Sequence, residues 1–283
     1  MFNYLQLLLL GAFAGLTIFL GIPLAVLQNV SSKKKGFLNA FAIGILIFLI
    51  VEVFSNAWGS AASSVFNAVS GKGAGNAVVD LLAMFGGLGL GLLGLTWYGR
   101  RYLKDTAPVR SIIQTNTTSD GKTNELQLLH QVSSYRMSMM IAVGIGAHNF
   151  SEGLTIGQSY ASGVIGLTLV LIVGFAVHNA TEGFGIAAPL TGISKRPSNR
   201  FLALVGLVGG GPTFLGTVLG SLLVSTFANI LFLSIAGGAL IYVTLLMYNS
   251  GRRQATDTIL MLGLFLGLTA GFVTDLLVTL GGA

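Results

Sequence analysis

The chain has 283 residues, of which 53% are hydrophobic and only 8% are charged, and its formal net charge is +6. Soluble domains carry about 25% charged residues, so this composition excludes a soluble globular protein and indicates an integral membrane protein. The chain has no cysteine, which excludes disulfides and thiolate metal ligands. The positive charge implies no nucleic acid partner, because its placement along the chain explains it.

Apolar stretches long enough to cross a bilayer recur eight times, since a span needs about 20 apolar residues. The predicted spans are 4–28, 37–60, 77–99, 135–158, 163–190, 200–225, 227–248 and 258–281. The first lacks the basic region and cleavage site of a signal peptide, so we interpret it as a retained helix. The polar segment 105–134 predicts a flexible cytoplasmic loop. Residues 1–283 then form a single all-α transmembrane domain.

Lysine and arginine gather in alternate loops between these spans. All of the 15 basic residues except Lys72 fall in the loops that follow the first, third, fifth and seventh spans. The positive-inside rule places these loops in the cytoplasm and both termini outside it. The asymmetry also supports the count of eight, because a missed or extra span would scramble it.

A faint internal repeat relates spans 1–3 to spans 6–8. Residues 42–48 resemble 236–242, and residues 15–21 resemble 211–216. The matched spans run in opposite directions through the membrane, so they predict a 3+2+3 bundle with an inverted repeat. Such repeats surround midplane substrate sites in many transporters.

One motif occurs twice in the middle of the chain. The copies are His148-Asn149-Phe150-Ser151-Glu152-Gly153 and His178-Asn179-Ala180-Thr181-Glu182-Gly183. Helix residues four apart share a face, so each His points the same way as its Glu, and the Asn borders that face. The two spans run in opposite directions, and both histidines lie near the middle of their spans. The sequence therefore predicts two facing motifs at similar depth near the bilayer centre.

Ionisable side chains inside a membrane are costly, so they are functional candidates by default. Neutral imidazole with carboxylate suits zinc, iron, manganese, cobalt or nickel, whereas calcium and magnesium prefer all-oxygen ligands. Two carboxylates cancel the charge of one divalent ion, so we expect one ion at a time. The alternative is a buried polar lock, in which each His hydrogen-bonds its Glu. Two copies at matching depth favour the metal site.

Three further acids lie within the predicted spans. Glu52 is well inside the second span, where it either lines the metal pathway or forms a structural hydrogen bond. Asp80 and Asp275 lie toward the outer ends of the third and eighth spans. For these two, hydration or a helix cap is a sufficient explanation.

The doubled motif on the fourth and fifth of eight spans resembles the bacterial and archaeal type of the ZIP family of divalent-metal transporters. Bacterial members carry His-Asn-x-Pro-Glu-Gly in each of these helices. The resemblance implies zinc uptake into the cytoplasm across the cell membrane, with iron, manganese, cobalt, nickel and cadmium as alternative substrates. It also implies relative motion of two helix groups and a homodimer, with no resident cofactor and no enzyme activity.

The resemblance also assigns site residues. A primary metal site would use His148, Glu152, His178 and Glu182. A secondary site would use Asn149, Glu152, Asn179 and Glu182. Glu52 matches an acid often seen in the second helix of relatives.

This sequence departs from the family pattern at several positions. Ser151 and Thr181 replace the proline of each motif. Gly211 stands where many relatives have a Glu of the second site, and Leu246 and Met247 replace acids of the seventh helix. These departures remove groups from the second site and from the usual exit route, and leave the primary four ligands intact.

Two other functions fit part of the pattern. An intramembrane hydrolase could activate water on zinc held by His and Glu, but no His-Glu-x-x-His motif is present. A ZIP-like metal sensor without transport would follow from the missing acids. Accumulation of zinc in vesicles separates a transporter from both.

Overall fold

The computed structural model describes residues 3–27, 30–71, 75–102, 121–163, 165–193, 195–222, 225–252 and 255–280. Every regular element in these ranges is helical. The elements are α1 (Tyr4–Leu16), η1 (Thr17–Leu20), η2 (Ile22–Val26), α2 (Ser32–Val69), α3 (Gly75–Tyr102), α5 (Gly121–Ala161), α6 (Ile165–Ala187), η3 (Ala188–Leu190), α7 (Asn199–Gly220), α8 (Thr226–Gly251) and α9 (Asp257–Leu280). The expected all-α architecture is confirmed, and each predicted span falls on one of the eight long helices.

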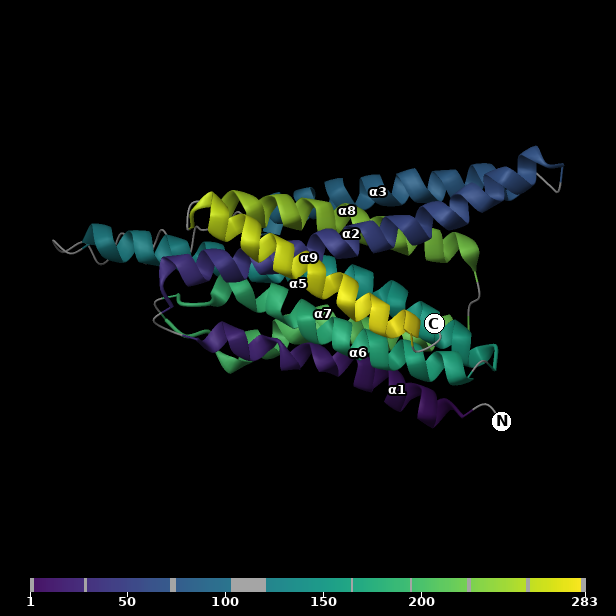
Figure 1. The fold of residues 1–283 in the computed structure, drawn as a ribbon, viewed down its shortest axis with the longest axis horizontal. Helices are drawn as coiled ribbons and strands as arrows, with labels where there is room; N and C mark the ends of the chain where they lie inside the picture. Colours follow the sequence, from purple (N-terminus) through teal and green to yellow (C-terminus); the bar gives the residue numbers. More distant parts are fainter. Residues whose placement is uncertain are drawn as a thin grey trace.

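The long helices lie side by side, and both ends of the chain lie at the same end of the bundle (Figure 1). Six segments in the described ranges are long and apolar enough to cross a membrane: Tyr4–Val26, Ser32–Val69, Asn76–Arg101, Asn199–Gly220, Thr226–Asn249 and Asp257–Leu276. Their outer faces carry exposed large apolar side chains, such as Leu82 on α3 and Phe265 on α9. Such faces suit lipid rather than water as the surrounding solvent.

Two helices are longer than predicted. Helix α2 covers Ser32–Val69 instead of 37–60, because it begins within the lysine run and continues through the Ala- and Ser-containing residues 61–69. Helix α5 begins at Gly121, inside the segment predicted as a flexible loop. Residues 121–134 include Glu, Gln and several Leu, which are good helix formers despite the polar composition. Residues 105–120 of that loop lie outside the described ranges.

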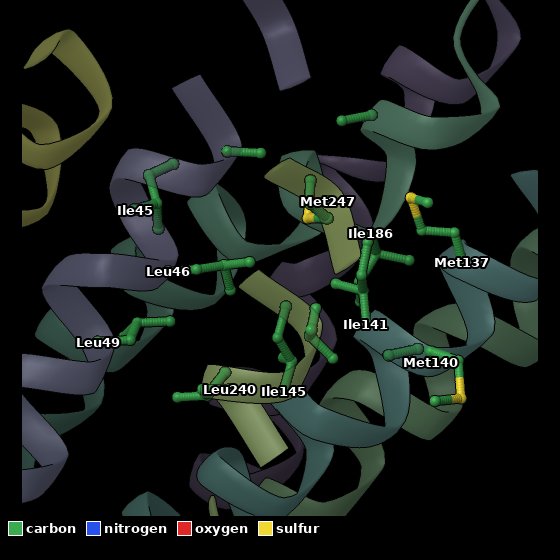
Figure 2. Packing of buried hydrophobic residues seen from close by; sticks show 14 of the residues in the cluster. Ile45, Leu46, Leu49, Met137, Met140, Ile141, Ile145, Ile186, Leu240 and Met247 are labelled. Carbon is green, nitrogen blue, oxygen red and sulfur yellow. The ribbon is translucent and has the colours of Figure 1, made fainter. Parts of the chain in front are cut away.

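The main hydrophobic core lies where α2, α5, α6 and α8 meet (Figure 2). Its labelled members are Ile45, Leu46, Leu49, Met137, Met140, Ile141, Ile145, Ile186, Leu240 and Met247. This packing fixes α2 beside the two helices that carry the doubled motif.

Three extensive helix–helix contacts join helices that are distant in the sequence. Helix α5 lies along α7, α2 packs against α9, and α3 packs against α8. The expected repeat matches span 2 (α2) with span 7 (α8), and span 3 (α3) with span 8 (α9). Under this exchange the α2–α9 pair becomes the α8–α3 pair. The inverted repeat itself stays a prediction.

Candidate metal centre

Helices α5 and α6 bring the two copies of the motif together in the interior of the bundle. His148, Glu152, His178 and Glu182 are each no more than 5% exposed. The Nε2 atom of His148 lies 3.3 Å from Oε1 of Glu152 in its own copy and 3.7 Å from Oε1 of Glu182 in the other copy. The two imidazole rings have centroids 5.9 Å apart. The facing arrangement expected from helical spacing is therefore present.

Helix α2 adds a carboxylate to this cluster. Single ligand atoms of Glu52, His148 and His178 all lie within 4.8 Å of one another, so these three groups could hold a metal ion. Phe48, one turn before Glu52, packs its ring 5.8 Å from the ring of His178. The sequence alone made Glu52 only a candidate for the metal pathway. Its position as the lone acid deep in an apolar span was the feature of the sequence that pointed to a role near the metal.

The polar atoms of the cluster form few hydrogen bonds among the residues that the structure describes, although Nε2 of His148 lies within ion-pair distance of Glu152 and Glu182. Both nitrogens of His148, Nε2 of His178, Oε2 of Glu52 and both carboxylate oxygens of Glu152 and Glu182 are buried and form no hydrogen bond of good geometry. Buried polar groups without partners are costly, and native structures contain few of them. A polar lock would pair these atoms by hydrogen bonds, whereas a bound cation would satisfy several acceptors at once.

The asparagines of the two copies make matching contacts. Nδ2 of Asn149 donates to the carbonyl of Gly209 on α7 at 3.0 Å, and Nδ2 of Asn179 donates to the carbonyl of Ala14 on α1 at 2.9 Å. In both residues Oδ1 is buried and lacks a partner in the described ranges. The side-chain nitrogen of each Asn thus links a motif helix to a neighbouring helix, and its side-chain oxygen stays available for another partner.

The residues that replace proline also behave alike. The hydroxyl of Ser151 donates to the carbonyl of His148, and the hydroxyl of Thr181 donates to the carbonyl of His178, each at 2.6 Å. Helices α5 and α6 continue through both motifs. Because the helices are unbroken, each His and its Glu keep the i, i+4 relationship.

The glycine that ends each motif marks a close approach between helices. A Cβ at Gly153 would meet the backbone of Thr213 on α7, and a Cβ at Gly183 would meet the backbone of Ile18 and Gly21 near η1. In a membrane, small residues allow such approaches and the packing that follows from them. The two contacts, with those of the asparagines, fix how the motif helices are rotated.

The remaining acids and the substituted positions are not among the residues of this cluster. Asp80 is 4% exposed and accepts a 2.6 Å hydrogen bond from the hydroxyl of Ser64, so it links α3 to α2 rather than meeting water or capping a helix. Asp275 is half-buried on α9. A Cβ at Gly211 would meet no atom of the described residues within 4 Å, so none of their side chains lies against the place of the missing Glu. The carbonyl of Met247 accepts a hydrogen bond from Asn39.

Long helices with apolar outer faces and a polar interior cluster define a multi-pass integral membrane protein. A family model described as ZIP zinc transporter matches residues 106–278, which is more than half of the chain, and the chain belongs to this family. Membership implies transport of divalent metal ions across a membrane rather than enzyme catalysis. Both copies of the motif fall inside the match, whereas Glu52 lies before it. A comparison with curated proteins gave no match.

Proposed function

We propose that this protein carries zinc into the cytoplasm through the His/Glu cluster between α2, α5 and α6. His148, Glu152, His178 and Glu182 would bind the transported ion, and Glu52 would supply a further carboxylate. The observation that carries this proposal is the convergence of buried acceptors that lack hydrogen bonds. A divalent cation is the ligand that such a mixed set of nitrogen and oxygen atoms suits best.

The charge of the ligand set also affects how many ions the site would hold. With Glu152 and Glu182 alone, a second divalent ion would leave a buried charge of +2, which favours a single ion. Glu52 adds a third negative charge near both histidines, so a second ion would leave +1. One ion at the histidines remains the simplest occupancy. The oxygens of Asn149 and Asn179 would be the additional ligands of a second ion.

The proposed orientation of the bundle in the membrane follows from charge. Both termini lie at one end of the bundle (Figure 1), and the basic residues of the connecting loops belong to the other end. The positive-inside rule assigns the basic end to the cytoplasm, and inward movement of the ion is part of this proposal. Labelling of Lys33 from the cytoplasmic side only would support this orientation.

The matching contacts of the two motifs support an inverted repeat. Asn149 and Gly153 bind the fourth span to the sixth, and Asn179 and Gly183 bind the fifth to the first. A two-fold axis that exchanges these spans would place one metal site on the axis, as in other transporters with inverted repeats. The homodimer and the sliding or rocking of two helix groups stay predictions.

Uptake by protein in reconstituted vesicles tests the proposal. The wild-type protein should accumulate zinc with time, and Glu152→Ala should abolish accumulation. Asp80→Asn, which alters a buried acid outside the cluster, should retain it. Zinc binding without accumulation would instead favour a metal sensor, and cleavage of lipid or peptide would favour a hydrolase.

A further inference from the structure

A second polar pocket lies away from the metal cluster, where α3, α5 and α8 meet. It has a volume of about 260 Å³. Arg100 of α3 and Arg136 of α5 line it, together with Ser133 of α5 and Tyr242 of α8. Met140 forms part of its buried wall. No residue of the metal cluster lines this pocket.

The polar groups that line the pocket are all hydrogen-bond donors or carry positive charge. Two guanidinium groups and two hydroxyl groups are present, and none of the lining residues is acidic. Among the residues described, neither guanidinium has an ion-pair partner or a hydrogen bond. Arginine presents a planar set of donors that matches phosphate oxygens. The complementary ligand is therefore an anion, and a divalent cation would be repelled.

The position of the pocket points to a lipid. It lies beside Arg101 at the basic end of α3, where a head group of the cytoplasmic leaflet would lie. Leu93 and Trp97 on the preceding turns of α3 are 67% and 60% exposed, so they offer an apolar surface to acyl chains. Exposed tryptophan is typical of the membrane interface, and basic pockets between transmembrane helices bind anionic head groups.

We propose that this pocket binds the phosphate group of an anionic phospholipid between Arg100 and Arg136. The acyl chains then lie along the exposed face of α3. The lipid joins α3 and α8, which pack together, to α5, which carries the first copy of the metal motif. The site is independent of the metal cluster, so either assignment stands if the other fails.

Native mass spectrometry of the full-length purified protein tests the site with phosphatidylglycerol, phosphatidylcholine and inorganic phosphate as probes. The wild-type protein should retain phosphatidylglycerol over phosphatidylcholine, and the double variant Arg100→Gln/Arg136→Gln should lose this preference by roughly tenfold. The control is Arg200→Gln/Arg252→Gln, which removes the same charge from exposed positions outside the pocket. It should bind like the wild-type protein.

A second variant tests the pocket without changing charge. A Cβ at Gly99 would lie 3.1 Å from Cε of Met140 and 3.4 Å from the hydroxyl of Tyr242, so Gly99→Leu should fill the pocket. It should lose phosphatidylglycerol although both arginines remain. Full retention by either pocket variant would overturn the proposal. Binding of inorganic phosphate with no retention of phosphatidylglycerol would overturn the assignment to lipid.

Discussion

Nε2 of His148 on α5 lies 3.7 Å from Oε1 of Glu182 on α6. This contact joins the two copies of the motif across a helix interface, and both groups are buried. An imidazole from one helix and a carboxylate from the next can therefore bind the same ion.

Replacement of Glu182 by Gln should abolish zinc binding, because it removes a negative charge while it preserves the size of the side chain. Loss of an outer-shell partner typically costs roughly 10- to 100-fold in metal affinity, and loss of a direct ligand should cost more. Isothermal titration calorimetry measures the change. Asp80→Asn is the matched control, since Asp80 is a buried acid bonded to Ser64. Equal zinc affinities in both variants would argue against Glu182 as a ligand.

Glu52 should also affect zinc affinity, although it lies outside the family match. Its carboxylate is close to both histidines, so Glu52→Gln should weaken zinc binding and slow uptake. Glu52→Asp, which keeps the charge on a shorter side chain, should retain part of the affinity. Uptake by Glu52→Gln at the wild-type rate would show that the residue serves only the packing of α2.

Asn149→Ala should reduce zinc affinity more than it reduces stability. The hydrogen bond from Nδ2 to Gly209 is one interhelical bond, and such bonds in membrane proteins contribute about 0.6 kcal/mol on average. Loss of the oriented Oδ1 should weaken binding in addition. Thermal unfolding with and without zinc separates the effects, because ligand stabilisation depends on affinity. An unchanged zinc-induced shift in Tm would leave Asn149 with a structural role alone.

Gly183→Val should destabilise the protein, because its side chain would collide with the backbone near Ile18 and Gly21. Overpacking of this kind typically costs about 1–3 kcal/mol. The control is Gly86→Ala on α3, where an added Cβ meets nothing within 4 Å. Unfolding in detergent should show a clear loss for Gly183→Val and none for the control. Wild-type stability of Gly183→Val would contradict the close helix approach.

Competition between ions should follow the chemistry of the ligands. The cluster contains two imidazole groups, so calcium and magnesium, which prefer all-oxygen shells, should not slow zinc uptake even in large excess. Cadmium, cobalt and manganese should compete, since nitrogen and carboxylate ligands suit them. Vesicle uptake of radioactive zinc measures this order. Strong inhibition by magnesium would contradict a transport site that includes the two histidines.

The sequence predicted the bundle and the facing motifs because both depend on local rules. Apolar length predicts spans, and i, i+4 spacing places His148 with Glu152 and His178 with Glu182 on single faces. Polar composition was a poor guide at residues 121–134, whose good helix formers extend the helix. Helix α5 begins at Gly121, in a segment whose polar composition suggested a loop.

The contributions of neighbouring helices could not be predicted from the motif. Whether Glu52 points toward the histidines depends on the rotation of α2 about its axis, which its packing against α8 and α9 determines. The bonds from Asn149 and Asn179 end on backbone carbonyls of α7 and α1, and no sequence pattern identifies such partners. From the sequence alone, Asp80 was explained by hydration or a helix cap, since its partner, Ser64, lies on another helix and no local rule identifies it.

Anomalous scattering at the zinc edge, from crystals of the zinc-loaded protein, would locate the bound ion relative to the cluster. The account predicts a strong peak between His148 and His178, within coordination distance of at least one carboxylate of Glu52, Glu152 or Glu182. It also predicts that the peak disappears in Glu182→Gln. A peak elsewhere in the bundle, with none between the two histidines, would contradict the assignment of the cluster as the transport site.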